Sequence, residues 1–120
     1  MSEYAKKYGV HLITLIAPTS KERVKMLAKD AMGFIYLVSS LGVTGARTQF
    51  SSNLKDTIKQ IKEVTNVPVM IGFGISNAEQ AKAMYEIADG IIVGSAFVKV
   101  IAEYGADSAP HIKKLLKELT

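Results

Sequence analysis

The sequence predicts one α/β domain made of four β/α units, (βα)4, with all strands parallel. Short apolar runs alternate four times with amphipathic stretches along the 120 residues. The runs are apolar at consecutive positions, which is typical of strands that are buried on both faces of a parallel sheet. Each run is followed by a helical stretch, as a right-handed crossover between parallel strands requires. No linker or low-complexity segment interrupts the pattern, so we expect residues 1–120 to form a single domain.

The first two units occupy the amino-terminal half. The apolar run at residues 12–17 predicts the first strand, and the β-forming residues 34–38 predict the second. Between them, Thr19 and Glu22 have the spacing of a capping box and predict the start of a helix. A long loop over residues 39–52 and a helix from about residue 53 to residue 64 should follow the second strand.

The last two units follow the same order. Residues 68–72 and 90–93 predict the third and fourth strands. A second capping box, at Ser76 and Glu79, predicts a helix that reaches about residue 87. A further helix should begin near residue 96, and a last one should span residues 110–119, where proline suits the first turn.

Composition excludes several classes of protein. The net charge is +4, but the lysines are spread along helical segments without interleaved aromatic residues, which indicates a solvated face and not a nucleic-acid platform. No apolar run is long enough to span a membrane, and the amino terminus lacks the apolar core of a signal peptide. The absence of cysteine removes disulfides and thiolate metal sites. We therefore expect a cytoplasmic protein that binds neither nucleic acid nor membrane.

Two loops at the carboxyl ends of predicted strands have the features of an anion site. Ligands of parallel β/α folds gather at these ends. The loop after the third strand has two glycines in three residues, so its amides can approach a ligand closely. The loop after the fourth strand leads directly into a helix, whose free amides and dipole favour an anion. These loops hold Gly72, Phe73, Gly74, Gly94 and Ser95. Glycines that only permit tight turns are the alternative, but two such loops on successive strands favour phosphate.

The position of the predicted phosphate site indicates half of a barrel. Eight-unit β/α barrels frequently bind phosphate in the loops after strands seven and eight, and they need about 200 or more residues. The third and fourth strands of this chain therefore correspond to strands seven and eight. The fold class that we predict is the (βα)4 half of a (βα)8 barrel, with two open edges and an uncovered inner face that favour closure by self-association.

Groups that could transfer protons are missing from these loops. No Asp or Glu follows directly on a predicted strand, and His11 and His111 have the positions of surface or packing residues. Tyr36 lies in the middle of the second strand, where its hydroxyl could point into a site or its ring could simply pack. No group of residues has metal-ligand spacing. The chain thus has an end that holds phosphate but no obvious general acid or base.

Three segments together resemble the second half of the tryptophan synthase alpha subunit. They are residues 36–45 (Tyr-Leu-Val-Ser-Ser-Leu-Gly-Val-Thr-Gly), residues 72–76 (Gly-Phe-Gly-Ile-Ser) and residues 94–96 (Gly-Ser-Ala). The resemblance extends from about Tyr8 to the end of the chain. It implies a (βα)8 barrel that cleaves indole-3-glycerol phosphate to indole and glyceraldehyde 3-phosphate. The indole then passes to a beta subunit that carries pyridoxal phosphate, so no cofactor is expected on this chain.

The resemblance assigns roles to individual residues. Those that hold the substrate phosphate and its surroundings would be Gly45, Gly72, Phe73, Gly74, Gly94 and Ser95. Tyr36 would line the active site beside the catalytic glutamate, and Thr44 would lie on the mobile loop that orders the catalytic aspartate. Both catalytic carboxylates belong to strand two of the family and the loop after it, and this sequence has no matching segment.

The sequence leaves three functions open. The first is a tryptophan synthase alpha-type chain that is inactive alone and needs a complementary amino-terminal half, with the beta subunit as a further partner. The second is a non-catalytic or engineered half barrel that forms a homodimer and binds at most a phosphate or sulfate ion. The third is another sugar-phosphate barrel of histidine or tryptophan biosynthesis, against which the Gly-Val-Thr-Gly loop argues.

Overall fold

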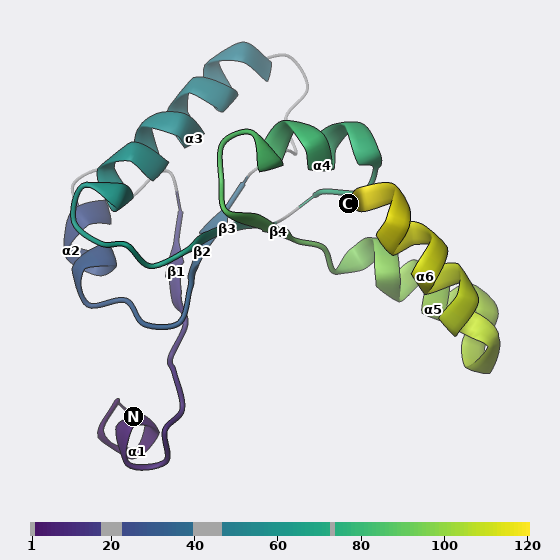
Figure 1. Cartoon of the computed structure of the whole chain (residues 1–120), viewed down its shortest axis with the longest axis horizontal. Coiled ribbons are helices and arrows are strands. Elements are labelled where there is room, and N and C mark those ends of the chain that lie inside the picture. Colours follow the sequence, from purple (N-terminus) through teal and green to yellow (C-terminus); the bar gives the residue numbers. More distant parts are fainter. Residues whose placement is uncertain (1, 18–22, 40–46, 73) are drawn as a thin grey trace.

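The chain forms a parallel sheet of four strands that alternate with helices (Figure 1). The computed structural model describes residues 2–17, 23–39, 47–72 and 74–120. In chain order, the elements are α1 (Ser2–Lys7), β1 (Thr14–Ile16), α2 (Val24–Lys29), β2 (Ile35–Val38), α3 (Arg47–Lys62), β3 (Val69–Gly72), α4 (Ala78–Tyr85), β4 (Gly90–Ile92), α5 (Ser95–Tyr104), a 3-10 turn η1 (Gly105–Asp107) and α6 (Ser108–Leu119).

The strand order confirms the predicted (βα)4 architecture. The strands lie in the order β1-β2-β3-β4, and each neighbouring pair is parallel. Each strand is therefore paired with the strand before it or after it along the chain. Within the described residues, β1 and β4 each have one side without a paired strand, so the sheet has two open edges.

One face of the sheet carries the hydrophobic core. Side chains of a strand alternate between its faces, and the set that points to the helices is fully buried: Ile16, Ile35, Leu37, Val69 and Ile71. Helices α2, α3 and α4 supply the opposing side chains, which are Val24, Ala28, Leu54, Ile58, Ile61, Ala81 and Met84. This helix-covered face is the layer that holds the sheet together.

The other face, which we call the open face, carries apolar side chains that are not fully covered. Leu15, Tyr36, Met70 and Gly90 follow one another across the four strands in register. Leu15 is 61% exposed, and Tyr36 and Met70 are half-buried. One step further along the strands, Val38 and Ile92 are also half-buried. The open face is therefore apolar, and no described element forms an opposing layer on it.

The last two helices project away from the sheet together (Figure 1). Helix α5 packs mainly on α6 and the turn η1 and has no buried residue. The rings of Tyr104 and His111 stack at 3.6 Å between centroids and join the two helices. Leu119 at the end of α6 is buried, and α6 packs on α4 there. The radius of gyration, 16.0 Å, exceeds the value of about 14 Å for a compact domain of this length.

Several element boundaries differ from the prediction. Helix α3 begins at Arg47, although the sequence predicted a loop up to residue 52, and α1 was not predicted. The cap of α4 is Asn77, whose side chain accepts a hydrogen bond from the Gln80 amide at 2.9 Å. The Gln80 side chain in turn accepts from the Ser76 amide at 2.9 Å. The capping box is thus displaced by one residue, and the one predicted at Thr19 lies outside the described residues.

No helix in the part of the chain that the structure describes is both long and apolar enough to cross a lipid bilayer.

Candidate functional site

The candidate phosphate site lies where β3 and β4 end, side by side. Gly72 is the last residue of β3 and pairs in register with Ile92, the last residue of β4. The loops that follow therefore start at the same level of the same sheet edge. Gly74, in the first loop, has φ +79°, a left-handed conformation that glycine adopts without steric cost. The sequence predicted this juxtaposition, and the sheet provides it.

The amino terminus of α5 forms one wall of the site. Gly94 is the N-cap residue, and its carbonyl accepts the first helical hydrogen bond, from the Val98 amide at 3.1 Å. Because glycine has no side chain, it cannot accept from the amides of the first turn. Gly94 and Ser95 are exposed, and a Cβ built at Gly94 would meet no atom within 4 Å. The first-turn amides and the positive end of the helix dipole are thus open to an anion.

Tyr36 occupies the open face directly beside Gly72. A Cβ added at Gly72 would lie 2.6 Å from Cζ of Tyr36, so the ring lies where that side chain would be. Glycine at position 72 therefore allows a tyrosine to reach the end of the neighbouring strand. The sequence left both packing and a site role open for Tyr36, and the structure shows a ring that packs over the first residue of the candidate site.

Ser39 fixes the ends of β2 and β3 to one another. Its amide donates to the Gly72 carbonyl at 2.8 Å, and its hydroxyl donates to the same carbonyl at 3.0 Å. Ser39 is fully buried. Sequence reasoning did not assign this role, although a serine directly after an apolar strand is a signal that could have suggested it. The two bonds hold the start of the candidate site in a fixed position.

The structure describes only some of the predicted site residues. Gly72, Gly74, Gly94 and Ser95 lie at or just after the carboxyl ends of β3 and β4. Tyr36 lies inside β2, and its ring reaches Gly72. Thr44, Gly45 and Phe73 lie outside the described residues.

Two ion pairs are found among the described residues, and neither involves a residue of the candidate site. Asp89 precedes β4, and its Oδ2 accepts from the Val69 amide at 2.7 Å and pairs with Lys62 Nζ at 2.6 Å. The hydrogen bond from Lys62 is the main cause that lowers the pKa of Asp89, and the Val69 amide adds to it. Lys25 and Glu63 pair at 2.6 Å between α2 and the residue after α3, which lowers the pKa of Glu63. These carboxylates connect structural elements and do not face the candidate phosphate site.

The two histidines do not belong to the candidate site either. His11 is exposed, and His111 stacks on Tyr104 in the α5–α6 pair. Among the described residues, no three His, Asp or Glu side chains gather as metal ligands would. Of the described carboxylates, none lies at the carboxyl end of a strand.

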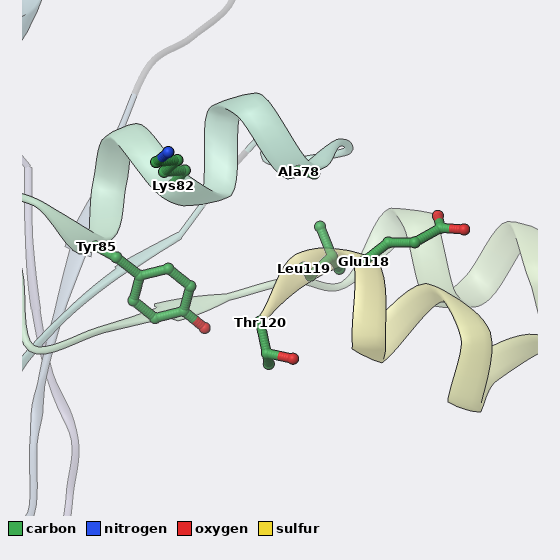
Figure 2. Close-up of a pocket in the computed structure, with 6 residues that line it drawn as sticks. All are labelled: Ala78, Lys82, Tyr85, Glu118, Leu119 and Thr120. Atoms are coloured by element: carbon green, nitrogen blue, oxygen red, sulfur yellow. The ribbon is translucent and has the colours of Figure 1, made fainter.

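A shallow cavity of about 630 Å³ lies elsewhere, between α4 and the end of α6 (Figure 2). Figure 2 shows the Tyr85 ring extending from α4 toward Thr120. The lining residues are Ala78, Lys82, Tyr85, Glu118, Leu119 and Thr120. None of the predicted phosphate residues that the structure describes, Gly72, Gly74, Gly94 and Ser95, lines this cavity.

Comparison with known proteins identifies the family. The family model for the tryptophan synthase alpha chain matches residues 1–120. The chain is 49% identical to the tryptophan synthase alpha chain of Lacticaseibacillus casei over 115 residues, which cover 96% of this chain and 43% of that protein. It is 50% identical to the one of Bacillus subtilis strain 168 over 103 residues, covering 86% and 39%.

Solved structures agree with this result. The tryptophan synthase subunit alpha of Campylobacter jejuni superposes with a TM-score of 0.83 at 39% identity, covering 98% of this chain and 46% of that one. A structure of the tryptophan synthase α2β2 complex of Pyrococcus furiosus gives a TM-score of 0.77 at 38% identity, covering 98% and 48%. The chain thus spans less than half the length of these relatives and matches one half of their barrel. It belongs to the tryptophan synthase alpha chain family.

Proposed function

We propose that this chain supplies the phosphate-binding half of a lyase site that cleaves indole-3-glycerol phosphate to indole and glyceraldehyde 3-phosphate. The observation that carries the proposal is the uncapped amino terminus of α5 beside the glycine-rich end of β3. Membership of the alpha chain family supports this choice of reaction and substrate.

The phosphate group anchors the end of the substrate that does not react. In this proposal its oxygens accept hydrogen bonds from the first-turn amides of α5 and from the Ser95 hydroxyl. The glycine loop after β3 closes around the other side, with Gly74 letting the backbone approach the anion. Thr44, Gly45 and Phe73 complete the site by their match to the family motif. Binding energy from the remote phosphate then orients the indole-bearing end for reaction.

The proton-transfer groups of the reaction come from outside this half. The described carboxylates lie on helices, or at the end of the sheet opposite to the candidate site, as Asp89 does. We infer that both catalytic carboxylates belong to a complementary amino-terminal half of the barrel. Tyr36 would then line the active site beside the catalytic glutamate. The chain alone should therefore release no indole. Because the Pyrococcus furiosus relative belongs to an α2β2 complex, the beta subunit is the partner to test once a complete barrel is formed.

The phosphate site can be tested by placing a carboxylate on it. Gly94→Asp puts an acceptor where nothing lies within 4 Å of the new Cβ, at a backbone φ of −116° that any residue adopts. Aspartate is a preferred N-cap residue, so its carboxylate should occupy the amides and repel phosphate. Titration calorimetry with glycerol 3-phosphate should show binding to the natural chain and at least a tenfold loss in the variant.

Gly94→Ala is the matched control for this test. It adds a Cβ in the same open space without a charge, so the affinity for glycerol 3-phosphate should change less than threefold. The fold should survive in both variants, and the Asp variant should be more stable by a few tenths of a kcal/mol because it caps α5. Equal affinity of the Asp variant and the natural chain would contradict the assignment of the phosphate to α5.

Catalysis needs a complementation assay. Indole release should be absent with the chain alone, and it should appear when the amino-terminal half of the Lacticaseibacillus casei alpha chain is added. Gly94→Asp should reduce the activity of the mixture. Indole production by the purified chain without that half would contradict the proposed division of the site.

A further inference from the structure

The loop that follows β3 combines high backbone freedom with a task that needs a fixed geometry. It begins at Gly72, contains Gly74 and ends at Ser76, one residue before the cap of α4. Glycine loses more conformational freedom on folding than any other residue. An anion binds most tightly to donors that are already in place, because ordering them during binding weakens the affinity. A phosphate loop with two glycines is therefore expected to depend on contacts from outside the loop.

Ser39 supplies such a contact at the first end of the loop. It follows directly on β2 and is fully buried. Its amide donates to the Gly72 carbonyl at 2.8 Å and continues the parallel ladder between β2 and β3. Its hydroxyl donates to the same oxygen at 3.0 Å. A carbonyl oxygen has two lone pairs, so the amide and the hydroxyl together can occupy both of them.

Ile75 and Gln80 hold the other end of the loop. Ile75 is 2% exposed and belongs to the hydrophobic core. Ser76 donates twice to Oε1 of Gln80, from its amide at 2.9 Å and from its hydroxyl at 3.2 Å. Gly74 lies between these contacts and is exposed, with φ +79°. The loop is thus fixed at both ends, and its exposed glycine lies between the two anchors.

A serine that only satisfies its own buried hydroxyl is the simpler explanation for Ser39. Two observations favour a role in the site. The Gly72 carbonyl already accepts the ladder bond from the Ser39 amide, so the hydroxyl is not needed to satisfy it. The buried side chains of the strands beside it are Ile35, Leu37, Val69 and Ile71, so an apolar residue would suit this environment equally well. The second bond adds rigidity at the point where the glycine loop begins.

We propose that Ser39 is a positioning residue of the phosphate site, which presets the loop at residues 72–76 by fixing the Gly72 carbonyl, while Gln80 holds the opposite end. The inference rests on the proposed phosphate-binding function and identifies residues that set its affinity. Ser39 acts through the backbone of Gly72 and not by contact with the phosphate.

The first test is the affinity for glycerol 3-phosphate, measured by titration calorimetry. Ser39→Ala removes the hydroxyl bond and leaves the amide bond in place. The affinity should fall by about three- to tenfold, which corresponds to the net contribution of one neutral hydrogen bond. Ser39→Thr keeps the hydroxyl and should restore the affinity to within about twofold of the natural chain. Its extra methyl group should lower the urea midpoint, so this variant separates affinity from stability.

Ile61→Val is the matched control for a loss of stability. Ile61 is fully buried in the last turn of α3, which leads to the start of β3 and not to its end. The lost methyl group should lower the urea midpoint, and the affinity for glycerol 3-phosphate should stay unchanged within error.

Gln80→Met tests the second anchor. It keeps the length of the side chain but removes the acceptor for Ser76, and the affinity should fall by about threefold. The backbone amide of residue 80 still bonds to the Asn77 side chain, so α4 remains capped.

Nuclear magnetic resonance gives a readout that a general loss of stability would not change. In Ser39→Ala the amide signal of Gly74 should shift and broaden, because the loop samples more than one conformation, and saturating glycerol 3-phosphate should sharpen it. The same signal should be unchanged in Ile61→Val.

The outcomes separate this inference from the proposed function. Equal affinity of Ser39→Ala and the natural chain would overturn the inference, as would a folded Ser39→Thr variant that binds as weakly as Ser39→Ala, or an equal loss in Ile61→Val. If Gly94→Asp loses binding while Ser39→Ala and Gln80→Met retain it, the positioning role fails and the proposed function stands. A natural chain that does not bind glycerol 3-phosphate would overturn both.

Discussion

The two faces of the sheet are built from the same strands and from similar residues, but helices cover only one of them. Leu37 points to the helices and is fully buried, whereas Leu15 points to the open face and is 61% exposed. Both are leucines in parallel strands. The difference arises because α2, α3 and α4 lie over one face only. Apolar character on both faces of a strand therefore indicates that two layers are needed, and the described helices supply one of them.

The largest effect should come from truncating leucine on the covered face. Leu37→Ala leaves a cavity in the core and should lower the free energy of unfolding by about 2–5 kcal/mol. Leu15→Ala, measured by urea denaturation, should cost less than about 0.5 kcal/mol. Equal losses from the two substitutions would show that the faces are covered alike.

A smaller effect is expected where a large side chain of the open face rests on a glycine. Gly72→Ala would place its Cβ against the ring of Tyr36. Because the face is open, the ring can move outward, and the substitution should cost about 1–3 kcal/mol. In the double variant with Tyr36→Ala, most of the cost of Gly72→Ala should disappear, which a double-mutant cycle measures. Strictly additive losses at positions 36 and 72 would contradict the packing described.

Gly90→Ala should cost less than Gly72→Ala. Met70 Sδ lies 2.6 Å from the Cβ that would be added at position 90, and the methionine side chain adapts easily.

The ion pair between Lys62 and Asp89, at the start of β3 and β4, should contribute less to the free energy of unfolding. Asp89→Asn keeps an acceptor for the Val69 amide but removes the charge that pairs with Lys62, and should cost about 0.5–1 kcal/mol at pH 7 because the pair is partly exposed. The folded pKa of Asp89 lies below its unfolded value of about 3.9. Its contribution is therefore present above about pH 4 and is lost as the pH falls through the folded pKa. The difference in unfolding free energy between the natural chain and the Asp89→Asn variant, measured by urea denaturation, should close in that acid range. A constant difference would contradict this.

The smallest effect should come from the pair at the surface. Glu63 and Lys25 are about half exposed, so Glu63→Gln should leave the thermal midpoint unchanged within error at about 0.15 M salt. A marked loss would mean that α2 is held on α3 by charge and not by the core side chains between them.

The four strands and their parallel order could be predicted, because short apolar runs followed by amphipathic stretches allow few other arrangements. The start of α3 could not. Ser51 and Ser52 are weak helix formers, and Phe50 is the only large apolar residue between positions 47 and 53, so no periodic signal marks the first turns. The α4 cap was misplaced by one residue because Ser76 and Asn77 are both good caps, and only the position of Gln80 decides between them.

The candidate site was predicted in part. Glycine loops after two successive strands were sufficient to place Gly72 next to the start of α5, because strand ends meet at one edge of a parallel sheet. The roles of Tyr36 and Ser39 depend on their contacts with Gly72 of the neighbouring strand. The local sequence pattern predicts neither the packing of the Tyr36 ring over Gly72 nor the two hydrogen bonds to the Gly72 carbonyl.

The order β1-β2-β3-β4 also bears on how the chain comes apart. Each described strand pairs only with strands that are adjacent in sequence, so the sheet resembles a short repeat array in which each unit depends on its nearest neighbours. In the part of the chain that the structure describes, β2 and β3 have a paired strand on each side, whereas β1 and β4 have one. Opening should therefore begin at both ends and proceed inward, and amide exchange should be slowest at the centre of the sheet.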